Sequence, residues 1–134
     1  MPPRRKKPEP EYRLRVFHFR DEGGKRSVAV VIETLKEFVS FRYEVLLEDQ
    51  QTENEIRLRI LGLHAPVSVM PGIGPARGIR FYPSLSGTVT IRVRKLDGKE
   101  NEFVVTIGRT SVSLVRSPRH PFILFSQEPL TLEI

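Results

Sequence analysis

Proline is absent from two long stretches of this chain, residues 11 to 65 and residues 84 to 117, although the chain contains 11 prolines. A proline inside a sheet removes a hydrogen-bond donor, so blocks of hydrogen-bonded strands need proline-free sequence. The segment from 63 to 86 lies between these stretches and includes the end of the first and the start of the second. It holds four prolines and three glycines. We therefore expect two blocks of β structure joined by a long structured loop over 63–86.

Within both blocks, apolar and polar residues alternate over short runs. From 12 to 20, Leu14 and Val16 alternate with arginines, which indicates a strand with one buried face. The run from 27 to 35 is nearly continuous in apolar, β-branched residues, which predicts a strand covered on both faces. Asp97 and Gly98 lie between two alternating runs and predict a hairpin. The expected strands are 12–20, 27–35, 38–48, 55–63, 87–96, 101–108, 110–115, 122–125 and 130–134.

The number and spacing of these strands predict the fold class. Residues 38–48 also fit a helical face, but their aromatic and β-branched content favours a strand. Eight to ten short strands at hairpin spacing are typical of an all-β, single-domain antiparallel β-sandwich, with a β-barrel as the alternative. A chain of 134 residues is long enough for one core, so we expect a single β domain over 12–134. Residues 1–11 are rich in proline and charge and predict a disordered basic tail.

Several classes of chemistry lack the residues that they need. There is no cysteine, which excludes disulfides, thiolate metal sites and cysteine catalysis. The histidines, His18, His64 and His120, have no metal-ligand spacing, and the aspartates fall in turns or at a strand end. We expect no catalytic residue, no metal and no cofactor. No segment reads as a signal peptide or a membrane helix, so we expect a cytoplasmic protein without a membrane partner.

The chain is basic, with a net charge of +6 and an isoelectric point of about 10.1. Such a balance favours anionic partners. The tail carries one basic cluster, which could contact nucleic acid or another polyanion, or could simply keep the chain soluble: Arg4, Arg5, Lys6 and Lys7. The tail holds four of the 22 basic and two of the 16 acidic residues, so the rest of the chain keeps an excess of four basic residues.

An Arg-x-Arg pattern recurs on three of the expected strands. Side chains two residues apart share a face, so each pair projects away from the apolar set of its strand. If the three strands were neighbours, six guanidiniums would form a platform for phosphates or acidic protein surfaces. The alternative is that glutamates of adjacent strands, such as Glu44, Glu48 and Glu102, neutralise the pairs. The six candidates are Arg13, Arg15, Arg57, Arg59, Arg92 and Arg94; Phe17 and Phe19 lie on the arginine side of the first strand.

The expected loop over 63–86 is a second candidate site. Its glycines do not fit the dinucleotide-binding spacing, but their backbone amides could hold an anion beside two arginines. A tight turn between two sheets explains the same glycines and prolines. The candidates here are His64, Met70, Arg77 and Arg80.

The sequence favours a non-enzymatic β-sandwich module that binds or assembles through protein–protein contacts, with a protein partner or a homo-oligomer. The apolar strands expected at 122–125 and 130–134 motivate this hypothesis, because a terminal strand can pair with a sheet edge of another chain. The alternative function is binding of nucleic acid or another polyanion through the basic tail and an arginine-rich sheet face.

Overall fold

The computed structural model describes residues 9–39, 43–65 and 72–132, and within these ranges the chain forms nine strands and no helix. The described residues accordingly contain no helix that could cross a membrane. The strands are β1 (Tyr12–Arg20), β2 (Arg26–Phe38), β3 (Glu44–Gln51), β4 (Glu55–His64), β5 (Gly74–Tyr82), β6 (Gly87–Arg94), β7 (Glu100–Ile107), β8 (Val112–Arg116) and β9 (Ile123–Ser126).

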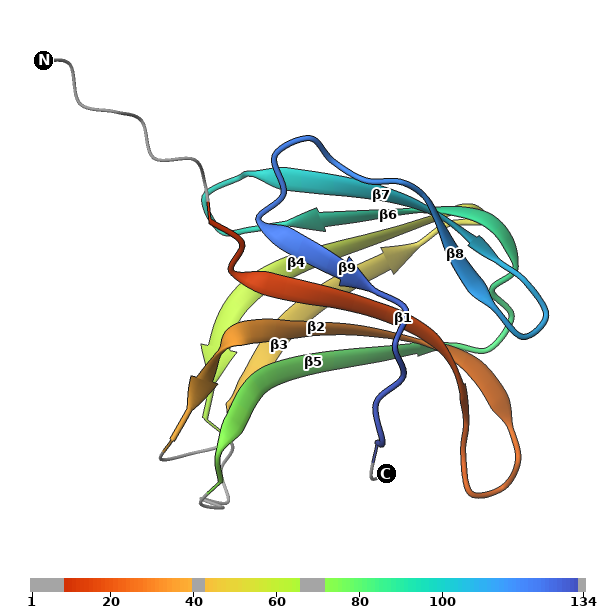
Figure 1. Ribbon diagram of the computed structural model, residues 1–134, viewed down its shortest axis with the longest axis horizontal. Coiled ribbons are helices and arrows are strands. Elements are labelled where there is room, and N and C mark those ends of the chain that lie inside the picture. Colours follow the sequence, from red (N-terminus) through yellow and green to blue (C-terminus); the bar gives the residue numbers. More distant parts are fainter. Residues whose placement is uncertain (1–8, 40–42, 66–71, 133–134) are drawn as a thin grey trace, which may run out of the picture.

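All nine strands belong to one sheet in the order β8-β7-β6-β4-β3-β5-β2-β1-β9. The sheet is curled into a half-barrel (Figure 1). It is mixed, because the β4–β6, β3–β5 and β1–β9 pairs are parallel and the others antiparallel. The all-β prediction is confirmed, and the Asp97-Gly98 hairpin forms between β6 and β7 as expected.

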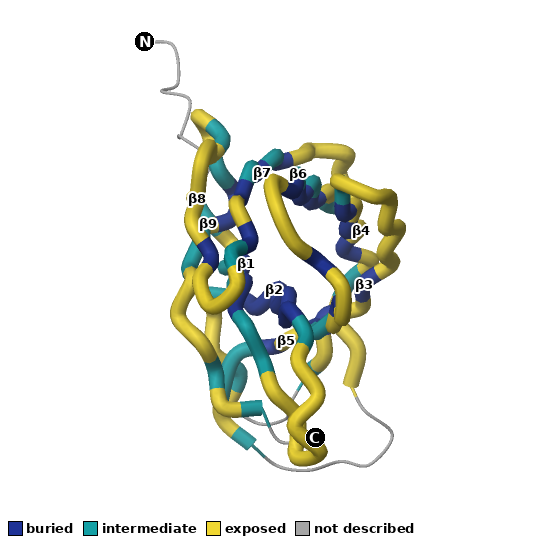
Figure 2. The backbone as a smooth tube through the Cα atoms, turned by 90° about the vertical axis from the view of Figure 1, so that its right-hand side faces the viewer, coloured by how far each residue is buried: buried dark blue, intermediate teal, exposed yellow. Residues whose placement is uncertain are grey.

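The main core lies on the concave side of the curled sheet, and Figure 2 shows the buried residues along the strands that surround it. Alternating side chains point into it, as the alternating sequence predicts: Leu14, Leu58 and Ile91 are almost fully buried. Each such side chain contributes roughly 1.5–3 kcal/mol through its removal from water. The alternation of apolar and polar residues therefore fixes which face of each strand is turned inward.

Strand β2 is buried on both faces, which confirms the reading of its continuous apolar run. Its outward side chains, Ala29 and Val31, form a second cluster with Phe17 on the convex side of the sheet. Leu130 and Leu132 pack against this cluster from outside. The described part of the strand expected at 130–134 is thus not a strand; Pro129 precedes it, and its leucines cover the outer face of β2 instead.

Side chains join the two ends of the curled sheet. The Oδ1 atom of Asn101 on β7 accepts hydrogen bonds from the backbone N–H groups of Phe122 (2.9 Å) and Ile123 (3.3 Å), where β9 begins. The N–H of Glu11 donates to the carbonyl of Phe122 over 2.7 Å, so the last residue of the expected tail is held by the fold. The basic cluster of the tail, residues 4–7, lies outside the described residues.

The structure corrects the prediction for 63–86, because residues 74–82 form β5, between β3 and β2. Pro75 is tolerated because it lies at the start of β5, next to an irregularity in the pairing with β2. Gly78 is required, since a Cβ atom there would lie 2.5 Å from the carbonyl oxygen of Val45. The strand expected at 38–48 is also shifted: β2 continues to Phe38 and β3 begins at Glu44.

Candidate functional site

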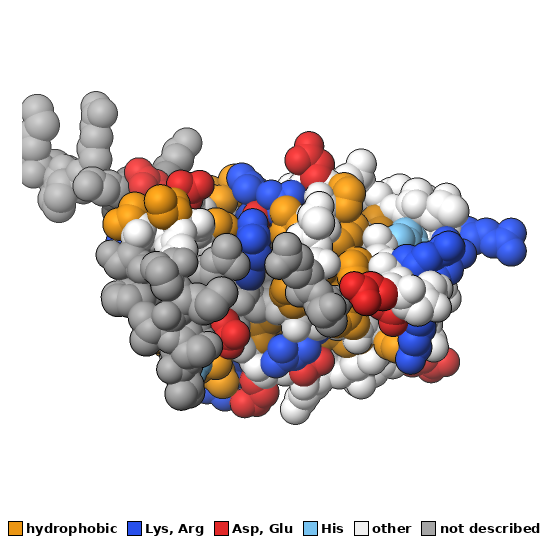
Figure 3. Space-filling view, turned by 90° about the horizontal axis from the view of Figure 1, so that it is seen from below, with side chains coloured by type: hydrophobic (Ala, Val, Ile, Leu, Met, Phe, Trp, Pro, Cys, Tyr) orange, Lys and Arg blue, Asp and Glu red, His pale blue; other side chains and the backbone are white. Residues whose placement is uncertain are grey.

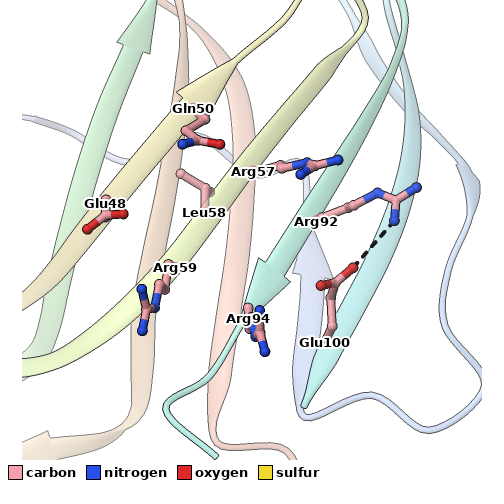
Figure 4. A pocket seen from close by; sticks show the side chains of 8 residues that line it. All are labelled: Glu48, Gln50, Arg57, Leu58, Arg59, Arg92, Arg94 and Glu100. Atoms are coloured by element: carbon pink, nitrogen blue, oxygen red, sulfur yellow. Dashed lines mark ion pairs between the residues drawn. The ribbon is translucent and has the colours of Figure 1, made fainter. Parts of the chain in front are cut away.

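The structure brings together four of the six arginines of the Arg-x-Arg pattern. Strands β4 and β6 are parallel neighbours, and Arg57 is opposite Arg92 while Arg59 is opposite Arg94 (Figure 4). Strands β3, β5 and β2 separate β1 from β4, so the arginines of β1 belong to a different part of the sheet. A single platform of six guanidiniums does not form. We call the four residues Arg57, Arg59, Arg92 and Arg94 the β4–β6 arginine surface.

One row of this surface, Arg57 and Arg92, is neutralised. The Nε atom of Arg57 donates to Glu55 Oε1 over 2.8 Å. The guanidinium of Arg92 lies 2.9 Å from Glu55, 3.5 Å from Glu100 and 3.4 Å from Glu102. The Nε atom of Arg92 is buried and donates no hydrogen bond, so its close approach to Glu55 is an electrostatic contact. For this row the interpretation that glutamates neutralise the arginines is confirmed.

The electrostatics of Glu55 reflect these contacts. The hydrogen bond from Arg57 lowers the pKa of Glu55, and the charges of Arg57 and Arg92 lower it further, against a smaller opposing effect of burial. The same hydrogen bond raises the pKa of Arg57. Both shifts favour the ionised forms of Glu55 and Arg57, in agreement with the contacts of this carboxylate to both arginines of the row.

The second row, Arg59 and Arg94, is different. Glu48 is the cross-strand neighbour of Arg59 and Glu100 that of Arg94, yet within the described residues neither arginine lies within ion-pair distance of a carboxylate. Figure 4 shows why for one of them: Glu100 is paired with Arg92. The two rows line a hollow of about 320 Å³ together with Glu48, Gln50, Leu58 and Glu100.

The arginines of β1 surround a buried carboxylate. Glu33 on β2 is 2% exposed and is contacted by Arg13 (3.3 Å), Arg15 (2.7 Å) and Arg77 (2.9 Å). Burial by itself would raise the pKa of Glu33, but the hydrogen bonds and charges of Arg15 and Arg77 outweigh it and lower this pKa. The sequence reasoning missed this role of Glu33; an acidic residue at the end of a continuous apolar run was the available signal.

Aromatic side chains lie away from the β4–β6 arginine surface. Phe17 and Phe19 are on the arginine side of β1, as expected, but Phe17 is buried in the second cluster and Phe19 packs on Phe81 with ring centroids 5.2 Å apart. None of the residues that line the hollow is aromatic. Among the described residues, the lining of this hollow therefore offers none of the stacking partners that platforms for single-stranded nucleic acid use.

The candidates from the expected loop do not form one site. His64 is exposed at the end of β4, and Met70 lies outside the described residues. Arg77 binds Glu33 on the outer face. Arg80 instead reaches across to β3, where it donates to the carbonyl of Leu47 over 2.8 Å and lies 3.3 Å from Asp49.

A groove follows the line where β3 and β5 separate. Only one ladder pair, Glu44 with Arg77, joins these strands in the described part of the chain, and beyond it they are joined by the side chains of Arg80 and Tyr82. The groove has a volume of about 360 Å³, and we call it the β3–β5 groove; its lining residues are Glu44, Val45, Leu46, Leu47, Arg77, Gly78, Ile79 and Arg80. Seen from the side on which β5 lies in Figure 1, hydrophobic side chains lie among the charged ones (Figure 3).

Hydrogen bonds fix the position of Arg80 at one end of this groove. The hydroxyl of Tyr82 donates to Asp49 Oδ2 over 2.9 Å, and Asp49 in turn faces Arg80. Burial, followed by the hydrogen bond and charge of Asp49, raises the pKa of Tyr82. Tyr82 therefore stays protonated and remains a donor to Asp49. The sequence reasoning singled out Arg77 and Arg80 but not the groove, because it assigned β5 to a loop.

In the part of the chain that the structure describes, the side chains that could bind a metal ion lie apart from one another. No three His, Cys, Asp or Glu residues lie close enough there to hold a metal ion. The ring of His18 contacts the carbonyl of Ser111 over 3.2 Å, a contact that joins β1 to the loop before β8. Comparison with models of protein families, with curated proteins and with solved structures finds no match for this chain.

Proposed function

We propose that this chain is a non-enzymatic binding module that acts through protein contacts, and that the β3–β5 groove is its contact site. The observation that carries the proposal is the groove itself, in which partly exposed apolar and charged side chains lie along the line where the ladder between β3 and β5 stops. Beyond Glu44 and Arg77 the two strands form no further ladder pair in the described residues, although Gly78 still lies close to the carbonyl of Val45 and Arg80 donates to the carbonyl of Leu47. Exposed apolar side chains beside guanidiniums in a groove are the kind of surface that extended protein segments bind.

The side chains of the groove suggest the chemistry of its ligand. Leu46 and Ile79 provide apolar contact, while Arg77 and Arg80, three residues apart, project from opposite faces of β5 at the rim of the groove. Both arginines keep exposed guanidinium surface although each already contacts one carboxylate. The ligand that fits is an extended protein segment with an apolar side chain between acidic residues.

The C-terminal segment, which the sequence favours as the contact site, is a weaker candidate than the groove because it is already bound to its own chain. Strand β9 pairs with β1 over four residues, from Ile123 to Ser126. Leu130 and Leu132 cover the second apolar cluster of the same chain. These contacts use, within one molecule, the segments that the sequence favours for pairing with another chain.

Selection from a displayed library of random linear peptides tests the proposal without a known partner. The wild-type protein should enrich peptides with an apolar residue flanked by Asp or Glu. The Leu46→Glu variant should not bind these peptides, because its new carboxylate repels their acidic residues. Leu114→Glu on β8 is the matched control, since Leu46 and Leu114 are both 40% exposed. The control should retain the selected peptides.

Two results would count against the groove. One is the absence of any enriched motif; the other is equal binding of the selected peptides by the wild type and by Leu46→Glu. Light scattering of the purified protein decides between a partner protein and a second copy. A dimer that dissociates in Leu46→Glu would assign the groove to self-association rather than to another protein.

A further inference from the structure

We infer that Arg59 and Arg94 form a binding site for a single phosphomonoester group, carried by a phosphorylated protein segment. The two guanidiniums lie on parallel neighbouring strands in the same register. Neighbouring strands are about 4.8 Å apart, so both side chains can reach one bound group. The inference that a protein segment carries the phosphate group rests on the proposed function. The phosphate site itself rests only on the two arginines.

The two arginine rows of β4 and β6 provide an internal comparison. Arg57 and Arg92 have the same strands, spacing and cross-strand register as Arg59 and Arg94. The first row is bound by Glu55, Glu100 and Glu102, whereas the second has no ion pair within the described residues. The difference arises because Glu100 pairs diagonally with Arg92 rather than directly with Arg94, its own cross-strand neighbour.

The shape and charge of the hollow fit a small dianion. Its lining carries four arginines and two glutamates, and because glutamates already pair with Arg57 and Arg92, the positive charge available to an anion comes from Arg59 and Arg94. A phosphomonoester carries about −1.5 to −2 charges at neutral pH and three acceptor oxygens. Guanidiniums bind such groups in a bidentate manner, and the amide of Gln50 in the same hollow can donate a further hydrogen bond.

The same face disfavours a long polyanion. Outside the hollow, Glu55 and Glu102 lie beside the arginines, and Glu102 also pairs with Arg116 over 3.1 Å. Phosphates spaced along a nucleic acid would extend onto these carboxylates and be repelled. The lining also offers no aromatic side chain for base stacking. A single phosphate group avoids both costs.

Isothermal titration at low ionic strength tests the site, because screening weakens exposed ion pairs. The probes are phenyl phosphate, a pool of random peptides with a central phosphoserine, the same pool without phosphate, and single-stranded DNA. The test variant is Arg59→Gln with Arg94→Gln. The matched control is Arg116→Gln with Arg119→Gln, which removes the same charge from exposed positions outside the hollow.

The wild type should bind phenyl phosphate with a Kd in roughly the millimolar range, and the phosphopeptide pool more tightly. The Arg59/Arg94 double variant should weaken both by at least about tenfold, whereas the Arg116/Arg119 control should lose less than about threefold. Leu46→Glu should bind phenyl phosphate like the wild type, so a failure of the groove and a failure of the phosphate site are distinguishable. Thermal unfolding of each variant verifies that it is folded.

Three outcomes would overturn the inference. Equal losses in the two double variants would show that net charge, not the hollow, attracts the anion. If phosphopeptides bind no better than phenyl phosphate, the inference that a protein segment carries the phosphate group is wrong. Tighter binding of single-stranded DNA, lost in the Arg59/Arg94 variant, would assign the hollow to nucleic acid.

Discussion

The Nε atom of Arg15 on β1 lies 2.7 Å from the Oε1 atom of Glu33 on β2, and Glu33 is almost fully buried. Arg77 on β5 binds the other oxygen of the same carboxylate over 2.9 Å. Arg15 also donates to the carbonyl of Glu128, in the segment that precedes the leucines of the second cluster. One carboxylate therefore links three strands, and through Arg15 it also positions the C-terminal segment.

Replacement of Glu33 by Gln should destabilise the protein by about 3 kcal/mol, because three arginines would lose their shared anion in a buried place. Arg13 and Arg77 are partly exposed, so water compensates part of the loss at their guanidiniums. Urea unfolding at neutral pH measures the change. The control Glu102→Gln, at a more exposed pair, should cost less than about 1 kcal/mol. Equal costs would mean that the burial of Glu33 adds nothing.

The stabilisation by Glu33 should disappear in acid. Its pKa in the folded protein lies below the ordinary value of 4.5, so the folded state binds the proton less readily than the unfolded state does. The contribution is thus fully present above about pH 4.5 and is lost as the pH falls through the lowered pKa. The gap in unfolding free energy between wild type and Glu33→Gln should shrink from about pH 7 to about pH 3. A gap that does not depend on pH would show that the carboxylate is not the origin of the difference.

Local patterns predicted most of the fold, because each reports directly on burial. The alternation around Leu14 and Leu58 identified which side chains face the core, and the continuous apolar run of β2 predicted two covered faces. Besides the shifted strand at 38–48 and the expected strand at 130–134, the prediction failed for β5. Its sequence has the proline and glycine content of a loop, but Gly78 is needed for its close approach to Val45, and Pro75 lies next to a pairing irregularity.

The candidate site depended on strand order, which local patterns do not contain. The Arg-x-Arg pairs of β4 and β6 are adjacent through a parallel pairing that no hairpin connects, whereas three strands lie between the pair of β1 and β4. The sequence predicted the outward direction of all six side chains. It could not show that Glu100 would pair with Arg92 rather than with Arg94, because this depends on the conformations of side chains on β6 and β7.

Asn101 should matter for the closure of the sheet at β9. Its Oδ1 atom accepts from the N–H groups of Phe122 and Ile123, so Asn101→Leu leaves two buried donors without a partner and should cost roughly 2–4 kcal/mol. Hydrogen exchange at these two amides should accelerate more than at amides in the middle of β2. The control Thr106→Val, at an exposed position of the same strand, should stay within about 0.5 kcal/mol of the wild type. Unchanged exchange in Asn101→Leu would mean that other contacts hold the start of β9.

Gly78→Ala should destabilise the protein by about 1–3 kcal/mol and widen the β3–β5 groove, because the added Cβ atom would lie 2.5 Å from the carbonyl oxygen of Val45. Backbone atoms cannot rotate away as a long side chain can, so β5 must shift as a whole. Gly23→Ala is the control, since its Cβ atom would approach nothing nearer than a carboxylate oxygen of Asp21 at 3.4 Å. Thermal unfolding measures both costs, and amide chemical shifts along β3 should change only in Gly78→Ala. Wild-type stability in Gly78→Ala would indicate that β3 and β5 can separate freely, in which case the single pair between Glu44 and Arg77 does not set the width of the groove.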